Sequence, residues 1–202
     1  LAMGGLIVFV SIFAMCFILP IWFHQDLNYQ DPTQKNIAPG FSFLSVPSDL
    51  KDNAEVIEFG PTYGVGVDKD GYVYEWGQLT KNLKKIPADM GKVVDIAVGQ
   101  DHVLAINDKG NLYTWGFNRM GLNVIPPELK GKKIADIEAG YQVSVVVTED
   151  GKVVSWGNTS AVDISTANVK DEKVKEVKAN IQTAIALTKD GKVISLAKKE
   201  TA

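Results

Sequence analysis

The chain has 202 residues, with 21 Lys and Arg against 24 Asp and Glu, a formal net charge of −3 and a single cysteine. An acidic balance with dispersed lysines argues against nucleic acid as a partner, because such binding needs clustered Lys and Arg that neutralise phosphates. One cysteine excludes an intrachain disulfide and a Cys-based zinc site.

The first predicted element is a transmembrane helix over residues 1–23, which contain no charged residue. A helix rises ~1.5 Å per residue, so about 20 apolar residues cross a hydrocarbon core of ~30 Å. The run lacks the small-residue cleavage pattern of a signal peptide and the polar face of a core helix. Trp22 and Tyr29 suit the headgroup zone, and Cys16 is expected to face lipid or another helix. The lipid bilayer is therefore the first predicted partner.

Residues 24–53 have the Pro, Gly, Asn and Asp content of a loop and are predicted to form a linker. Together with the end of the apolar run, this segment resembles the N-terminal edge of a permease subunit of bacterial dipeptide and oligopeptide ABC transporters. The matching residues are Leu19, Pro20, Ile21, Asp31, Pro32, Gln34, Ala38, Pro39 and Gly40. The resemblance implies an extracytoplasmic linker in the cell membrane, with other transporter subunits and a peptide-binding protein as partners. Family members continue with a His-x-x-Gly-Thr-Asp-like segment and further helices, which are absent here, so the chain is expected to be a fragment.

Residues 54–202 contain a unit that recurs about every 40 residues, the spacing of β-propeller blades. Its turn glycines lie between two β-rich runs in each copy, where glycine accepts the positive φ of a hairpin turn. Apolar residues fall into register with the two-residue period of strands, as in the column Val65, Leu104, Val145 and Ile185. The sequence therefore predicts an all-β fold, a β-propeller of four blade-like repeats with four-stranded blades. The turn glycines are Gly71, Gly110, Gly151 and Gly191.

Three repeats also carry a Trp-Gly pair at one position. Equivalence between copies favours packing between blades, where each Trp would bury ~150–250 Å²; the alternative is a tryptophan binding platform. The glycines of the pairs are expected at tight bends after a strand. The pairs are Trp76-Gly77, Trp115-Gly116 and Trp156-Gly157.

Residues 99–122 read G-x-x-H-x-L-A-x-x-x-x-G-x-L-Y-x-W-G-x-N-x-x-G-L, which resembles the regulator of chromosome condensation repeat. The resemblance covers about residues 54–198 and implies a seven-bladed propeller, so four repeats predict a partial ring. A small closed propeller is the alternative, because four to eight blades can close a ring. The specific positions are Gly99, His102, Leu104, Gly110, Trp115, Gly116, Asn118 and Gly121. The other copies depart from this pattern, with Tyr63, Val143 and Thr183 in place of His102 and Leu196-Ala197 in place of the last Trp-Gly. The nucleotide-exchange activity of the founding member is not carried over, because fold does not imply function.

Two non-enzymatic functions remain open at this stage. The first is a membrane-anchored propeller interaction domain of a peptide-type ABC permease, and the alternative is a single-pass adhesion or scaffolding protein with a propeller head. No catalytic group, metal site or cofactor site is predicted, because His24 and His102 are the only histidines and a zinc site needs three or four ligands. His102 is expected to be a hydrogen-bonded, half-buried structural residue. The sequence leaves the propeller's ligand, blade number, orientation and oligomeric state open.

Binding contacts are expected from the loops that differ most between copies rather than from repeated core positions. These loops are residues 78–87, 117–127 and 158–168. The most varied group is Phe117, Asn118, Arg119 and Met120, for which an ordinary blade connector is the alternative interpretation.

Overall fold

The computed structural model describes residues 2–22, 45–158, 169–180 and 183–196, and its contacts divide the chain into two units, Leu1–Lys35 and Asn36–Ala202. The first unit contains α1 (Ala2–Trp22), so the prediction of a helix is confirmed. No helix among the described residues is long and apolar enough to cross a bilayer, so the transmembrane assignment of residues 1–23 is not supported. Residues 24–44 of the predicted linker lie outside the described residues.

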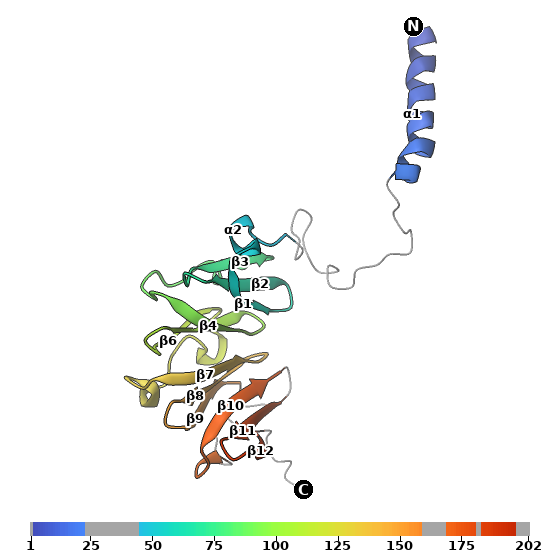
Figure 1. The fold of residues 1–202 in the computed structure, drawn as a ribbon. Helices are drawn as coiled ribbons and strands as arrows, with labels where there is room; N and C mark the ends of the chain where they lie inside the picture. The colour runs from blue at the N-terminus through green and yellow to red at the C-terminus, as the bar shows by residue number, and fades with distance from the viewer. Residues whose placement is uncertain (1, 23–44, 159–168, 181–182, 197–202) are drawn as a thin grey trace. The chain divides into compact units, whose positions relative to one another are not determined.

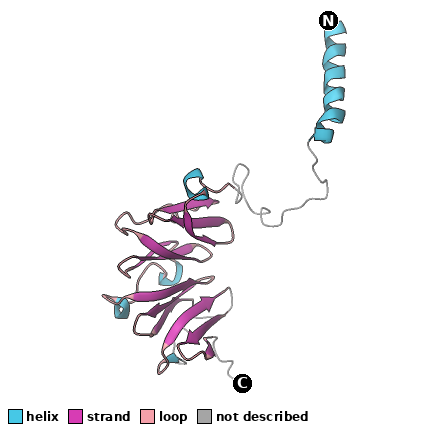
Figure 2. Cartoon of the chain, in the orientation of Figure 1, coloured by secondary structure: helices cyan, strands magenta, loops and turns pink. Residues whose placement is uncertain are grey.

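The second unit contains four three-stranded antiparallel sheets, each built from strands that are consecutive in sequence (Figures 1 and 2). We call these sheets, in chain order, repeats 1 to 4. Their strands are β1 (Ala54–Phe59), β2 (Tyr63–Asp68) and β3 (Val73–Gly77); β4 (Val93–Val98), β5 (His102–Asn107) and β6 (Leu112–Gly116); β7 (Ile134–Ala139), β8 (Val143–Thr148) and β9 (Val153–Gly157); and β10 (Val174–Ala179), β11 (Ala184–Thr188) and β12 (Val193–Ser195). The all-β fold with four repeats is confirmed.

The expectation of four strands in each blade is wrong for the sheets that the structure describes. After β6 the chain forms two short 3-10 helices, η2 (Arg119–Gly121) and η3 (Pro127–Leu129). After β3 it forms turns that lead past Pro87. Proline has no N–H to donate to a strand ladder, so these proline-containing connections do not add a fourth strand.

The hairpin turn between the second and third strands has the same chemistry in every repeat. A buried side chain at the end of the second strand accepts hydrogen bonds from turn amides: Asp68 Oδ1 from Tyr72 N at 2.9 Å, and Asn107 Oδ1 from Asn111 N at 2.9 Å. The turn glycines then adopt positive φ values of 89°, 73°, 84° and 90° in repeats 1 to 4. Threonine replaces the amide or carboxylate at Thr148 and Thr188, where its hydroxyl oxygen accepts from Lys152 N and Lys192 N.

Successive repeats are joined by backbone hydrogen bonds from these same turns. The carbonyl of Gly71 accepts from Val93 N at 3.2 Å, and that of Gly110 accepts from Ile134 N at 3.0 Å. The Gly151 carbonyl accepts from Val174 N at 2.9 Å in the same way. The first strands also lie next to one another, β1 with β4, β4 with β7 and β7 with β10. The repeat is therefore a stacking unit whose turn is a contact to the next copy.

Each pair of neighbouring repeats encloses its own apolar core. Repeats 1 and 2 bury Tyr63, Val65 and Val103 with Trp115, and repeats 2 and 3 bury Leu104 and Ile137 with Trp156. Repeats 3 and 4 bury Val145 and Val177 with Leu196, the residue that stands in the tryptophan column. This arrangement follows from the two-sided apolar pattern of the sheets, because neither face is covered unless another repeat lies against it.

The two end repeats are covered differently. Trp76 of repeat 1 lies against Gly64, and Leu50 from the short helix α2 (Ser48–Lys51) lies against Gly66, so a helical turn replaces the loop expected there. In repeat 4 the column positions Ile185 and Val193 are 42% and 65% exposed. The equivalent residues of repeats 2 and 3 are buried or half-buried because a further repeat packs on them.

Candidate binding face

One end of the stacked sheets carries the turns between first and second strands. We call this end the turn face; it consists of residues 60–62, 99–101 and 140–142, the ends of β3, β6 and β9, and the loops that follow them. Strand pairing brings Tyr63 opposite Gly77 and His102 opposite Gly116. Backbone hydrogen bonds join the two parts, as from Phe117 N to the Asp101 carbonyl at 2.8 Å.

Glycines at the start of each turn let neighbouring repeats approach closely. A Cβ on Gly99 would lie 2.6 Å from the Gly140 carbonyl oxygen and 2.4 Å from the His102 ring. A Cβ on Gly60 would lie 2.9 Å from the Gly99 carbonyl oxygen in the same way. These contacts are shorter than van der Waals packing allows, so the turns of successive repeats fit together only with glycine at these two positions.

The repeat position that His102 occupies, and that Tyr63 occupies in repeat 1, forms side-chain links between repeats rather than a metal site. The Tyr63 hydroxyl donates to the Gly99 carbonyl at 3.0 Å, and His102 Nε2 lies 3.1 Å from Ser144 Oγ in the next repeat. His102 is fully buried rather than half-buried. Burial lowers the pKa of His102 to about 4, although a backbone hydrogen bond to Val143 opposes this, so the ring is neutral at pH 7. No group of three His, Cys, Asp or Glu within the described parts of the chain is placed to hold a metal ion.

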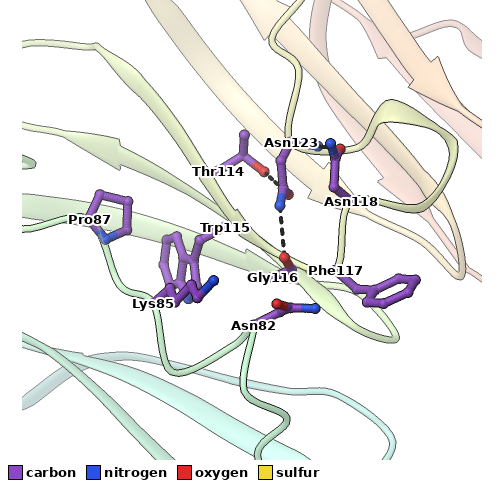
Figure 3. A pocket seen from close by; sticks show the side chains of 9 residues that line it. All are labelled: Asn82, Lys85, Pro87, Thr114, Trp115, Gly116, Phe117, Asn118 and Asn123. Carbon is purple, nitrogen blue, oxygen red and sulfur yellow. Dashed lines mark hydrogen bonds between the residues drawn. The ribbon is translucent and has the colours of Figure 1, made fainter.

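Two of the three predicted binding loops meet in one pocket, which we call the loop pocket (Figure 3). Its volume is about 500 Å³, and it lies between the loop after β3 and the end of β6. Its lining residues are Asn82, Lys85, Pro87, Thr114, Trp115, Gly116, Phe117, Asn118 and Asn123. Residues 159–168 of the third loop lie outside the described residues.

Amide side chains hold the wall of the loop pocket in place. Asn123 Nδ2 donates to the Gly116 carbonyl at 2.8 Å, and Asn118 Oδ1 accepts from Asn123 N at 2.9 Å. Phe117 lies under the guanidinium of Arg119, whose Cζ is 5.4 Å from the ring centroid. The pocket therefore offers amides, one lysine and an aromatic edge, a lining suited to polar contacts and without a carboxylate.

Trp115 contributes to this wall mainly as a packing residue. Its indole is buried between repeats 1 and 2, and its Nε1–H donates to Glu75 Oε1 of the neighbouring repeat at 2.8 Å. Trp156 Nε1 donates to the Leu122 carbonyl at 3.0 Å in the same direction, from one repeat to the previous one. Both indole donors are thus already paired within the protein, which leaves little of either ring to act as a binding platform.

A second and larger cavity, about 820 Å³, lies on the same face and was not indicated by the sequence. We call it the turn cavity. It is lined by residues from all four repeats: Glu58, Phe59, Gly60, Pro61, Thr62, Thr80, Val98, Gly99, Gln100, Asp101, Glu138, Ala139, Gly140, Tyr141, Ala179 and Asn180. Phe59 is 55% exposed and Tyr141 is 39% exposed. Asp101 adjoins His102 in sequence, but Asp101 lines this cavity whereas the imidazole of His102 is buried between repeats.

We expect the Glu75→Gln substitution to change how stability depends on pH. Burial raises the pKa of Glu75 from 4.5 to about 7, while the Trp115 hydrogen bond and Lys84 act to lower it. Between these two values the folded state keeps a proton that the unfolded state has released, so this group makes stability fall as pH rises. Glutamine keeps an acceptor for Trp115 and has no proton to lose. The urea midpoint of the wild type should therefore fall further from pH 5 to pH 8 than that of the variant.

Comparing the wild type with Glu75→Gln removes the contribution of His102 to the pH dependence of stability, which has the opposite sign to that of Glu75. Because burial lowers the pKa of His102, its contribution makes stability rise with pH between about 4 and 6.5, and both proteins share it. Parallel pH profiles for the wild type and Glu75→Gln would show that Glu75 is solvated and ionised in the folded state.

Comparison with known proteins agrees with this geometry. Residues 93–122 and 134–160 match the regulator of chromosome condensation (RCC1) repeat. The chain carries RCC1-type repeats. The matched segments begin at β4 and β7, the first strands of repeats 2 and 3. Repeats 1 and 4 lie outside the matched segments, in agreement with the degenerate signature that the sequence shows there.

Among solved structures, yeast RCC1 (Prp20) bound to Kap60 has a TM-score of 0.60 at 20% identity, over 75% of this chain and 45% of that chain. Among curated proteins, the mitochondrial RCC1 domain-containing protein RUG3 of Arabidopsis thaliana is 27% identical over 142 residues, 57% of this chain and 32% of its own length. The mouse serine/threonine-protein kinase Nek9 is 30% identical over 79 residues, 33% of this chain and 8% of its own. The chain thus spans a third or less of these two curated relatives. The structural likeness shows an RCC1-like propeller fold.

Proposed function

We propose that the RCC1-like propeller is a protein interaction domain that binds a partner through the turn face. The observation that carries this proposal is the turn cavity, in which one turn from each of four repeats contributes to a single concave surface. Exposed aromatic residues at its rim, Phe59 and Tyr141, are of the type that is enriched where proteins bind one another. The loop pocket opens on the same face and extends the surface toward the outer strands.

The turn cavity is a better contact surface than the repeated core positions because its exposed aromatic residues, Phe59 and Tyr141, are not members of the apolar cores described between the repeats. Tyr141 is exposed in the turn between β7 and β8, whereas Trp115 and Trp156 are buried between repeats. Loops on a rigid sheet scaffold can vary without cost to the fold, and they are where binding residues concentrate. The way the repeats stack therefore supports the proposal that this face binds a partner.

The Tyr141→Ala substitution tests this function, with Tyr72→Ala as a matched control. Tyr72 is 68% exposed in the hairpin turn at the opposite end of the strands. Proteins captured from the source cells by the wild type should be retained by Tyr72→Ala. They should be recovered roughly tenfold less well with Tyr141→Ala, because an aromatic residue that anchors an interface is worth about 1–2 kcal/mol or more. Equal recovery with both variants, or loss only with Tyr72→Ala, would place the contact away from the turn face.

The finer hypotheses drawn from the sequence concern where the domain works. The first hypothesis is that the propeller is a membrane-anchored domain of a peptide-type ABC permease and lies outside the cytoplasm. The alternative is that it is the head of a single-pass adhesion or scaffolding protein. The permease hypothesis is supported by the sequence match that ends at Gly40; of its residues, only Leu19, Pro20 and Ile21 fall within α1, and the others lie outside the described residues. The reading frame around the coding segment tests it, since permease membership requires further hydrophobic helices downstream.

A further inference from the structure

The turn cavity carries charge of one sign. Three acidic residues, Glu58, Asp101 and Glu138, are part of its lining, and none of the described residues that line it is Lys or Arg. Lys178 is the nearest cation to Glu138, with Nζ at 3.2 Å from Glu138 Oε2 and at 3.8 Å from Glu176 Oε1. This lysine is therefore shared between two carboxylates and does not balance the cavity as a whole.

Further carboxylates lie behind the rim on the first strands of repeats 2 and 3. Burial raises the pKa of Asp95 on β4, as do the charges of Asp136 and Glu58, while a hydrogen bond from Ile96 N and the charge of Lys178 act to lower it. Asp136 on β7 accepts a hydrogen bond from Val177 N at 2.7 Å, and among the described residues Lys178 is the cation that lowers its pKa. The inner strands thus place a negative potential beneath an open cavity, which favours a cationic occupant and repels polyanions.

Asp101 contributes a negative charge that is not fully compensated by hydrogen bonds. Its Oδ1 is buried and has no hydrogen-bond donor among the described residues. Burial raises the pKa of Asp101, and the charge of Arg119 on the neighbouring loop opposes this. A carboxylate oxygen left without a donor is costly, typically about 1–3 kcal/mol. The uncompensated charge of this carboxylate adds to the negative potential of the cavity, which a cationic ligand would lower.

The aromatic rim fits the same kind of ligand. Phe59 and Tyr141 are exposed at the cavity. An aromatic face attracts a Lys ammonium or Arg guanidinium that lies within about 6 Å of the ring centroid. The long aliphatic stems of these side chains also pack on apolar surface, which the cavity offers at Pro61, Val98 and Ala139.

We propose that the turn cavity binds a lysine- or arginine-bearing segment of a partner protein, an inference that rests on the proposed function of the turn face. The carboxylates of Asp101, Glu138 and Glu58 receive the cationic groups, and Phe59 and Tyr141 pack against them. A segment of a partner, rather than a small molecule, suits a cavity that is open and extends across four repeats.

The binding test uses fluorescein-labelled peptides and the full chain. One peptide of twelve residues carries four arginines in a Gly-Ser background, and two others carry glutamine or glutamate at the same positions. Fluorescence anisotropy should show at least ~10-fold tighter binding of the arginine peptide than of the glutamine peptide, and no binding of the glutamate peptide. Affinity for the arginine peptide should fall as salt is raised from about 0.02 to 0.3 M, because the cavity is open to solvent. Equal affinity for the arginine and glutamine peptides would overturn the proposal.

Isosteric substitutions locate the binding. Asp101→Asn and Glu138→Gln should each weaken binding of the arginine peptide by roughly 5- to 10-fold, as expected for the loss of a charge-assisted hydrogen bond. Glu149→Gln is the matched control, since Glu149 is exposed in the hairpin turn at the other end of repeat 3. Asp101→Asn guards against a folding artefact, because Asp101, unlike Glu138, forms no salt bridge with any residue that the structure describes. An effect of Glu149→Gln as large as that of Glu138→Gln would mean unspecific attraction to an acidic protein.

The two proposals fail in different ways. If Tyr141→Ala abolishes partner capture while the arginine peptide does not bind, the turn face is the interaction surface and the cationic specificity is wrong. If the arginine peptide binds and depends on Asp101 and Glu138, but capture of partners does not depend on Tyr141, the cavity has this specificity and the partner contact lies elsewhere.

Discussion

Trp115→Ala is expected to lower the free energy of unfolding by ~3–5 kcal/mol, the usual cost of removing a buried aromatic side chain. The indole is buried in the core that joins repeats 1 and 2, together with Tyr63, Val65 and Val103. The substitution also removes the donor to Oε1 of Glu75, a residue that is half-buried. Urea denaturation measures the loss. Because stability in stacked repeats depends on nearest-neighbour contacts, amide hydrogen exchange should also accelerate in repeat 1 more than in repeat 4.

Two further variants separate packing from other effects at this position. Trp115→Leu should lose ~2 kcal/mol, since leucine fills the same column at Leu196 and is fully buried there. Phe117→Ala removes a partly exposed aromatic two residues further along and should change stability by about 0.5 kcal/mol or less. A loss below 1 kcal/mol for Trp115→Ala would mean that this ring is not a packing residue and would reopen its interpretation as a binding platform.

The repeated positions were predictable because each obeys a local rule of backbone geometry or burial. Gly71 and Gly110 recur where the hairpin needs a positive φ, and Leu104 and Val145 recur where a strand face meets the next repeat. A strand period of two and a turn glycine are readable in any single repeat. The number of strands was not predictable in the same way, because the connections after the third strand follow no repeated pattern.

The turn cavity was not predictable, because its members have little in common along the chain. Phe59 ends a strand, Asp101 follows a signature glycine and Tyr141 lies in a turn whose sequence differs from the other copies. They meet only because successive turns stack through glycines such as Gly99, which is a three-dimensional consequence of the repeat. The loop pocket was predictable in part. Sequence variability between the copies indicated its two loops, but that they meet in one pocket is a consequence of stacking.

The difference between a pattern read along the chain and a contact made by stacking also explains the repeat position that His102 occupies. The signature position holds Tyr63, His102 and Val143 in successive repeats, which read along the sequence is a degenerating motif. In the structure the first two positions are occupied by buried side chains that make hydrogen bonds to the next repeat, Tyr63 to the Gly99 carbonyl and His102 to Ser144. Both residues link one repeat to the next. The side chains differ because the partner atoms differ, a backbone carbonyl for Tyr63 and a hydroxyl for His102.

Gly116→Ala should destabilise the fold by roughly 2–5 kcal/mol, because two costs combine at this one position. Its φ is +111°, a conformation that L side chains rarely adopt. An added Cβ would also lie 2.5 Å from the Asp101 carbonyl oxygen and 2.7 Å from the His102 Cα, both backbone atoms of the adjacent strand and turn. The Gly116 carbonyl accepts the hydrogen bond from Asn123 that holds the loop pocket. Thermal and urea denaturation measure the loss.

Gly121→Ala separates the two costs. Gly121 has a φ of +73°, but an added Cβ there would meet no atom within 4 Å, so only the backbone strain of about 1–2 kcal/mol applies. The difference between the variants therefore measures how tightly the end of β6 is held against the turn that bears Asp101. Gly157 repeats this geometry in the next repeat, with a φ of +108° and an added Cβ 2.4 Å from the Gln142 carbonyl oxygen, so Gly157→Ala should behave like Gly116→Ala. Equal losses for Gly116→Ala and Gly121→Ala would show that the turn moves aside freely, and a turn that moves freely would not form a preorganised binding face.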